Sequence, residues 1–287
     1  MNTSSWEVRL LGPMRAWRGG SEADLGTPAQ QSILAALLLR GGVHASVEEL
    51  AAGLWGPHRP PSQVGMIRTY VSRLRRSVAP AGREHIIRSV ARGYAVQAGS
   101  VIVDVARFRH LVDRAAAAKR AERLDDAAAD LGDALSLWNG TALAGLPGPY
   151  LEGQRQRLSQ LRWAAAEERI AIDIARGHHS EAIADLAVLA AEDPYRERLC
   201  ELRMRALWRA GRRADALATY HETRVLLATD LGIDPSPDLR ELHRAILRGT
   251  SDAGRWADHA ARSAGSGPMG AQFSASAARA ATAAAAA

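Results

Sequence analysis

Residues 62–78, SQVGMIRTYVSRLRRSV, decide the fold of the first third of this chain. Four apolar residues recur there at steps of four, three and four, which is the spacing of one buried stripe on an α-helix. They are Ile67, Val71, Leu74 and Val78. The stretch also holds four arginines and no acid, so nothing negative on it would repel an approaching phosphate. It predicts a helix, capped by Ser62, whose outer face suits DNA recognition.

Two shorter helices are predicted before this stretch. Thr27-Pro28-Ala29-Gln30 has a threonine cap, a proline at the first helical position and a glutamine three residues after the cap, and Gly41-Gly42 ends the helix. Ser46-Val47-Glu48-Glu49 repeats the capping box and opens a second helix. Pro60-Pro61 then turns the chain into the arginine-rich helix.

Short strands flank these helices. The stretches around Val8–Leu11 and Met14–Trp17 predict two strands with tight turns, and Ile86–Val90 and Tyr94–Val96 predict a hairpin whose tip is Ala91-Arg92-Gly93. Three helices followed by a basic hairpin make a winged helix-turn-helix. In that fold the third helix enters the major groove and the hairpin lies beside the DNA backbone or the minor groove.

The charge of the chain supports an anionic partner. The formal net charge is +6, the sequence pI is about 10.2, and 36 of the 37 basic residues are arginine. Residues 1–97 contain twelve arginines and six acids, so this third alone carries an excess equal to that of the whole chain. We therefore expect double-stranded DNA as the partner of this part.

Eight residues are predicted to contact DNA. Thr69, Ser72 and Arg73 are expected to meet base edges, because they lie on the outer face of the helix. The other five are expected mainly to hold phosphates: Arg68, Arg75, Arg76, Arg88 and Arg92. The alternative, an ordinary solvent-exposed face, is disfavoured by the position of this helix as the third before a basic hairpin.

From Phe108 to about Arg248 the sequence reads as successive helices. Gly177, Ala182 and Ile183 recur 34 positions later as Gly211, Ala216 and Leu217, which is the period of tetratricopeptide helix pairs. A less regular copy begins at Leu124, and Val101–Val105 is expected to be a short apolar connection. The fold class is therefore mainly α with a small β content: a winged helix followed by an all-α, tetratricopeptide-like part.

Several classes of site are not indicated. Gly145–Pro149 lacks the spacing and lysine of a phosphate loop, and His178-His179 has no further ligand at metal-binding spacing. No serine-histidine-acid order is found, so we expect no enzyme, no cofactor and no metal. Cys200 is expected to be a small core residue. No bilayer-spanning stretch or secretory signal is evident, and with the single cysteine this favours a cytoplasmic, nucleoid-associated protein.

A family resemblance rests on particular motifs. Trp55-Gly56, the run Tyr70–Arg76 and Arg92-Gly93-Tyr94 resemble the winged helix of the Streptomyces antibiotic regulatory proteins, and Val103–Phe108 and Asp230–Pro237 resemble the start and end of that family's bacterial transcriptional activation domain. The chain departs from the family pattern at Gln30-Gln31, where a basic pair is usual. It departs again at Ala91-Arg92, where a proline pair is common.

The resemblance implies a function and a domain order. It implies an activator that binds direct repeats upstream of biosynthetic promoters, as a head-to-tail homodimer on DNA, and recruits RNA polymerase holoenzyme through its sigma factor and other subunits. Arg73 would then be the main reader of a base. The domains would be residues 1–98 for DNA binding, 99–249 for activation and 250–287 as a disordered low-complexity tail.

Two other classes of function remain open from the sequence. A repressor or architectural DNA binder would keep the winged helix and use the helical part for dimerisation alone. An enzyme or ligand sensor would need a site in the helical part, where no catalytic motif is recognised.

Overall fold

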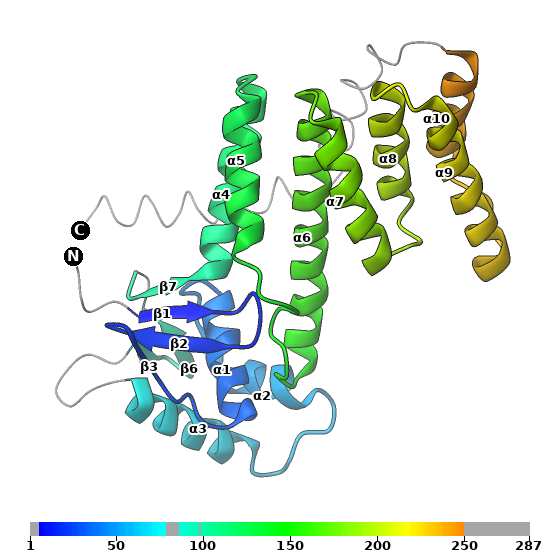
Figure 1. Cartoon of the computed structure of the whole chain (residues 1–287). Helices are drawn as coiled ribbons and strands as arrows, with labels where there is room; N and C mark the ends of the chain where they lie inside the picture. Colours follow the sequence, from blue (N-terminus) through cyan, green and yellow to red (C-terminus); the bar gives the residue numbers. More distant parts are fainter. Residues whose placement is uncertain (1–5, 79–85, 98, 250–287) are drawn as a thin grey trace. The chain divides into compact units, whose positions relative to one another are not determined.

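The four apolar residues of the 62–78 stretch are all buried along one side of a single helix, α3 (Gln63–Val78). This is the fold of a computed structural model that describes residues 6–78, 86–97 and 99–249 (Figure 1). The chain divides into two compact units, which meet in sequence between Leu186 and Ala187. The predicted turn at Pro80–Gly82 and the predicted tail at 250–287 lie outside the described residues.

The two predicted capping boxes are confirmed. Helix α1 (Pro28–Leu39) begins after Thr27, whose side chain accepts a hydrogen bond from the N–H of Gln30, while the Gln30 side chain accepts one from the N–H of Thr27. Helix α2 (Val47–Trp55) begins in the same way with Ser46 and Glu49. These reciprocal bonds satisfy N–H groups that the first turn of a helix leaves unpaired. Both helices pack against α3.

The hairpin after α3 is also present. Strands β5 (Ile87–Val90) and β6 (Gly93–Val96) pair antiparallel, and the short strand β4 (Ala45–Ser46) lies on the other side of β6. A Cβ atom at Gly93 would lie 2.0 Å from the carbonyl oxygen of Ala45, so only glycine allows this approach. The winged helix predicted from the sequence is therefore confirmed.

A second sheet has the order β3 (Ser21–Glu22), β2 (Arg15–Arg18), β1 (Trp6–Arg9) and β7 (Val101–Val103). Strands β1 and β2 were predicted from the sequence, but Val101–Val103 was expected to be only a connection. It is a strand that pairs parallel with β1, and helix α4 (Asp104–Arg120) follows it at once. The correction has a physical reason, because this segment satisfies backbone groups at an edge of β1 that would otherwise be open.

Asp104 joins the first helix of the helical part to the N-terminal sheet. Its carboxylate accepts hydrogen bonds of 2.9 Å from the N–H groups of Leu10 and Leu11, and one of 2.8 Å from that of Val105. The residue is buried. Burial raises the pKa of the Asp104 carboxyl, while these backbone hydrogen bonds act in the opposite direction.

The segment between α5 (Leu124–Ser136) and α6 (Pro149–Ala175) packs against the winged helix. The N–H groups of Asn139 and Leu143 donate to the carbonyl oxygens of Leu11 and Leu10, at 2.8 and 2.9 Å. The Ser32 hydroxyl donates to the carbonyl oxygen of Pro147 at 2.9 Å. The beginning of α6 lies against α2 and α1. One continuous hydrophobic core therefore includes the winged helix and helices α4, α5 and α6.

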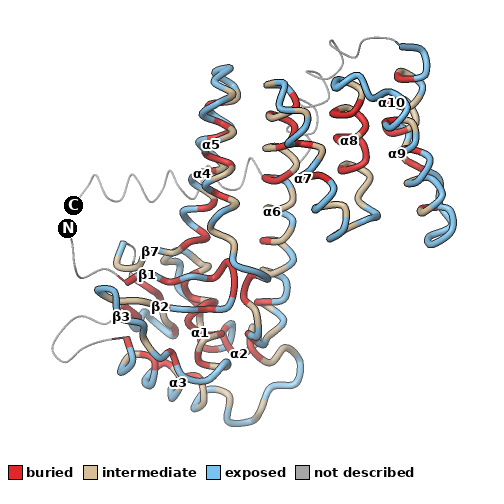
Figure 2. The backbone as a smooth tube through the Cα atoms, in the orientation of Figure 1, coloured by how far each residue is buried: buried red, intermediate tan, exposed pale blue. Residues whose placement is uncertain are grey.

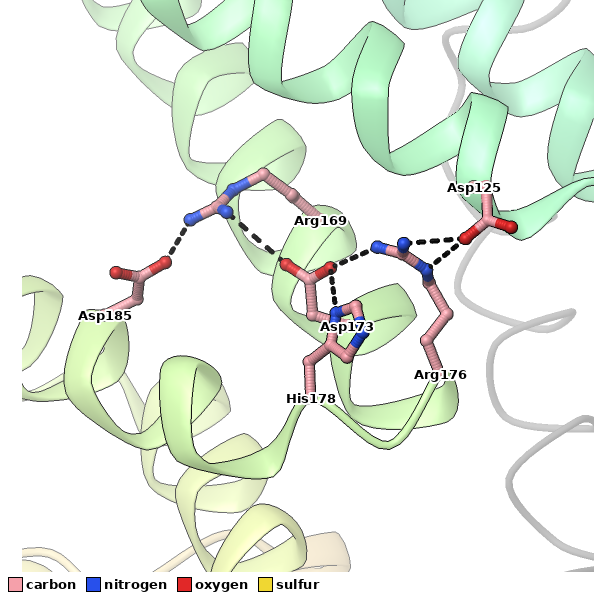
Figure 3. Close-up of polar contacts among 6 residues, drawn as sticks. All are labelled: Asp125, Arg169, Asp173, Arg176, His178 and Asp185. Atoms are coloured by element: carbon pink, nitrogen blue, oxygen red, sulfur yellow. Dashed lines mark hydrogen bonds and ion pairs between the residues drawn. The ribbon is translucent and has the colours of Figure 1, made fainter.

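An ion-pair network occupies the other end of α6 (Figure 3). The largely buried carboxylate of Asp173 accepts from Arg176 at 3.0 Å and from Arg169 at 3.4 Å. Arg176 also pairs with Asp125 of α5 at 2.6 Å, and Arg169 with Asp185 of α7 (His179–Glu192). The network thereby connects α5, α6 and α7.

The second unit contains α8 (Glu197–Arg209), α9 (Arg213–Leu226), a π-helical turn η1 (Leu227–Leu231) and α10 (Pro237–Arg248). Cys200 is buried in this unit, and burial raises the pKa of its thiol to about 11. The rings of Tyr220 and His243 stack with centroids 3.9 Å apart, which joins α9 to α10. No helix in the described ranges combines the length and apolarity needed to span a bilayer.

The 34-residue repeat has a structural counterpart. Gly177 and Gly211 both have positive φ, and in both cases the next N–H bonds to the carbonyl oxygen five residues earlier, at 2.9 and 2.8 Å. This is the left-handed helix ending that favours glycine. Ala182 and Ala216, five residues after each glycine, are buried. The predicted tetratricopeptide-like fold class is confirmed by these features together with the architecture.

The less regular copy predicted at Leu124 also follows such a helix ending. Glu122, after α4, has φ 59° although it is not glycine, and the N–H of Arg123 donates to the carbonyl oxygen of Ala118 at 3.0 Å. Ala127, five residues after Glu122, is buried. Because its left-handed residue is a glutamate, no glycine marks this helix ending in the sequence.

Candidate nucleic-acid interface

The outer face of α3 holds five of the eight residues predicted to contact DNA. Arg68, Thr69, Ser72, Arg73 and Arg76 are all exposed, while the apolar stripe beneath them is buried. Figure 2 shows this alternation of buried and exposed positions along α3. The helix carries no acid, and its last turn holds Arg75 and Arg76, which suits the negative end of the helix dipole.

Three other arginines of the first third have acidic partners. Arg9, Arg15 and Arg40 pair with Glu7, Glu22 and Glu49, at 3.1, 2.6 and 3.6 Å. Within the described residues, no acidic side chain pairs with any of the five exposed arginines of α3 and the hairpin. These five are Arg68, Arg73, Arg76, Arg88 and Arg92. Their charge is therefore uncompensated where a phosphate backbone could approach.

Arg75 has a different environment from the other arginines of α3. Its Nε donates to the carbonyl oxygen of Ile87 at 3.0 Å, and its terminal nitrogen donates to the hydroxyl of Ser89 at 2.9 Å. The guanidinium also lies over the ring of Tyr94, 5.6 Å from the centroid. Arg75 therefore connects α3 to both strands of the hairpin. This role has no local signal in the sequence, because it depends on contacts with residues twelve or more positions away.

Thr69 is exposed, but its hydroxyl already has an acceptor. Oγ1 donates to the carbonyl oxygen of Gly65, one turn earlier, at 2.9 Å. A Cβ atom added at Gly65 would meet no other atom within 4 Å, so the surface beside this bond is open. Thr69 can therefore offer a partner its methyl group and the two lone pairs of its oxygen.

Arg92 lies at the tip of the hairpin, in the turn that joins β5 to β6. Val90 pairs with Gly93, so Ala91 and Arg92 form a two-residue turn, in which Ala91 has φ 46°. Arg88 and Arg92 are exposed. Arg75 joins this hairpin to α3 through its contacts with Ile87, Ser89 and Tyr94.

His178 and His179, which the sequence did not indicate as metal ligands, lie at the end of α6 and the start of α7. His178 lies 4.0 Å from Asp173 in the network at the end of α6. Across the described parts of the chain, no group of three histidine, cysteine or acidic side chains is placed to hold a metal ion.

Comparison with known families and proteins matches both halves of this architecture. The family described as "Transcriptional regulatory protein, C terminal" matches residues 20–96, and "Bacterial transcriptional activator domain" matches residues 103–247. Regulatory protein DnrI of Streptomyces peucetius is 30% identical over 250 residues, which cover 84% of this chain and 92% of DnrI. The chain belongs to the Streptomyces antibiotic regulatory protein family.

Other members and relatives extend beyond this chain. Regulatory protein AfsR of Streptomyces coelicolor is 45% identical over 240 residues, or 83% of this chain, yet the chain spans about a quarter (24%) of the length of AfsR. The solved structure of Mycobacterium tuberculosis EmbR in complex with a low-affinity phosphopeptide matches with a TM-score of 0.80 and 31% identity. That match covers 86% of this chain and 66% of EmbR. The shared part is the winged helix and the helical domain.

Both matched family models are named for transcriptional regulation, and membership of the antibiotic regulatory protein family confirms the resemblance noted in the motifs. The two matched ranges leave out residues 97–102, which include the beginning of β7. The domain boundaries predicted at residues 98 and 249 stay predictions.

Proposed function

We propose that this regulator binds direct repeats near the promoter of an antibiotic or other secondary-metabolite gene cluster and activates transcription by recruiting RNA polymerase. The observation that carries the DNA-binding part is the exposure of Arg68, Arg73, Arg76, Arg88 and Arg92 on α3 and the hairpin, where no acid of the described residues pairs with them. The protein acts in the cytoplasm, on the nucleoid. Two protomers bind head to tail, because direct repeats require the same orientation at both half-sites.

Within this proposal, Arg73, Thr69 and Ser72 meet base edges. Arg68, Arg76, Arg88 and Arg92 hold phosphates. Arg75 is a positioning residue that holds the hairpin beside α3, because two of its three guanidinium nitrogens are already bonded to β5. This assignment departs from the expectation that Arg75 itself mainly holds a phosphate.

Binding is tested by selecting fragments of genomic DNA with the full chain. We expect fragments that contain direct repeats, and an affinity that falls steeply with salt because several phosphate contacts release counterions. Equal affinity for selected and random duplexes would contradict sequence-specific binding.

Activation is tested by transcription reconstituted with RNA polymerase holoenzyme on a promoter that carries the selected repeats. We expect more transcript with the protein than without it, and no increase when the repeats are scrambled. Less transcript would favour the alternative of a repressor whose helical part only dimerises.

The helical part is tested with a fragment that ends at residue 178, which keeps β7 and helices α4 to α6. A shorter fragment that ended at residue 97 would remove the strand that pairs with β1. We expect the 178-residue fragment to bind DNA and to activate less than the full chain. Full activation by the fragment would show that the second unit is not needed for recruitment.

A further inference from the structure

We propose that Thr69 selects an A·T base pair in the major groove by placing its methyl group against the 5-methyl group of thymine. The inference rests on the proposed DNA-binding function and adds the chemistry of one base position. It follows from the hydrogen bond between Thr69 and Gly65, which decides what this side chain can offer.

A threonine hydroxyl has one proton. Here that proton is directed to the Gly65 carbonyl at 2.9 Å, so donation to a base would require this bond to break. What remains is a methyl group and the two lone pairs of the oxygen. The bond also restricts the side chain to few rotamers, since Thr in a helix is already stiff about χ1.

The position of Thr69 gives this methyl group access to the groove. The apolar stripe of α3 is buried on the opposite side of the helix, and Thr69 is exposed. One turn earlier, Gly65 has no side chain, and the space around it is open. The outer face is therefore low at Gly65, one turn before Thr69, and the helix can approach the base edges closely there.

The bases differ in how well they fit this surface. In the major groove an A·T pair presents two acceptors, the N6 amino donor of adenine and the thymine methyl group, whereas a G·C pair presents two acceptors and one donor without a methyl group. A methyl group with an adjacent acceptor complements A·T. Guanine, which offers two acceptors, finds no donor on Thr69.

Arg73 lies one turn further along the same face and offers donors that suit guanine. Four residues along a helix correspond to about 6 Å, or roughly two base steps. The proposal therefore predicts an A·T pair about two steps from the base pair that Arg73 contacts.

The experiment uses the full chain and the duplex selected by it. Each thymine within the α3 footprint is replaced in turn by deoxyuridine, which removes only the 5-methyl group. We expect one replacement to weaken binding about fourfold, the effect of losing ~0.8 kcal/mol of methyl burial.

Two substitutions then separate the methyl group from the hydroxyl. Thr69→Ser keeps the hydroxyl and loses the methyl group, so it should bind about fourfold more weakly and become insensitive to deoxyuridine. Thr69→Val keeps a methyl group and loses the hydroxyl. It should therefore retain the wild-type affinity for the selected duplex and the loss of affinity on deoxyuridine replacement. Thr229 is a matched control, because its hydroxyl donates to the carbonyl of Val225 at 2.9 Å outside the winged helix, and Thr229→Ser should leave binding unchanged.

Three results would overturn the inference. They are a footprint without a thymine that responds to deoxyuridine, a Thr69→Ser variant as tight and as sensitive as the wild type, and a loss of binding confined to the Thr69→Val variant. All three leave the proposed function intact, provided the wild type still discriminates its selected duplex from random DNA. If it does not discriminate, the proposed function itself fails.

Discussion

The carboxylate of Asp104 accepts a hydrogen bond from the backbone N–H of Leu10, 94 residues earlier, at 2.9 Å. Replacing Asp104 with Asn would turn one acceptor oxygen into a donor that faces another donor. We expect the free energy of unfolding to fall by about 1 to 3 kcal/mol, the usual effect of leaving a buried polar group unsatisfied. Urea unfolding of the wild type and D104N measures the difference, and an unchanged midpoint would contradict it.

The same residue predicts a pH dependence. Burial raises the pKa of Asp104 in the folded chain above its ordinary value of 3.8, so the folded chain keeps this proton to a higher pH than the unfolded chain does. The free energy of unfolding should therefore fall as pH rises between the ordinary and the raised pKa. The stability advantage of the wild type over D104N should shrink in that interval. If the stability advantage of the wild type grew with pH instead, the backbone N–H groups would lower the pKa of Asp104 by more than burial raises it.

Arg75 should control the position of the hairpin. We expect Arg75→Ala to lower the free energy of unfolding by about 1 to 2 kcal/mol, because it removes two hydrogen bonds to β5. Hydrogen exchange should become faster in β5 and β6. Arg75→Lys should restore little of the lost stability, since one ammonium group cannot make the same pair of hydrogen bonds to Ile87 and Ser89 as two guanidinium nitrogens. Arg76→Ala is the control, and it should change stability by less than about 0.5 kcal/mol.

Arg73 and Arg76 should differ in how their loss affects binding. Arg73→Ala should relax specificity at one base position at a cost of about 1 to 3 kcal/mol, whereas Arg76→Ala should weaken all duplexes alike and reduce the salt dependence. Binding to selected and random duplexes at several salt concentrations measures both effects. If both variants lost the same affinity for the selected and the random duplexes, the assignment of Arg73 to a base and Arg76 to a phosphate would be wrong.

Asp173 should stabilise the end of α6 more than an exposed acid does. Its side chain is 13% exposed and is shared by Arg169 and Arg176. We expect Asp173→Ala to cost about 1 to 3 kcal/mol, because it leaves two arginines without their shared acid. Asp126, 57% exposed and paired with Arg123, is the matched control and should cost about 0 to 1 kcal/mol. Similar losses for both variants in thermal unfolding would contradict a special role for the network.

Glu122 should be a site where glycine stabilises the protein. With φ 59° it has the backbone conformation that Gly177 and Gly211 adopt at the equivalent helix endings. We expect Glu122→Gly to raise the free energy of unfolding by about 0.5 to 1 kcal/mol, because glycine adopts this conformation without strain. Gly211→Ala should have the opposite sign. Calorimetry would contradict the interpretation if both variants shifted the melting temperature in the same direction.

These residues also show how far the sequence could predict the structure. Signals that act within a few residues were sufficient for the capping boxes of α1 and α2, the buried stripe of α3 and the hairpin. The pairing of β7 with β1 depends on a partner more than 90 residues away, so nothing local distinguishes Val101–Val103 from a linker. The role of Arg75 likewise depends on Ile87 and Ser89. Its neighbours Arg73 and Arg76 carry the same side chain in a different environment.

Helix α6 separates two parts of the first unit by its own length. Its 27 residues extend for about 40 Å, which corresponds to roughly twelve base pairs of DNA. One end lies against α2, which packs on α3, and the other end is joined to α5 and α7 by the Asp173 network. A protein that binds at the Asp173 end would therefore be held at a set distance from the groove that α3 reads. The spacing between operator and promoter would then have to match that distance.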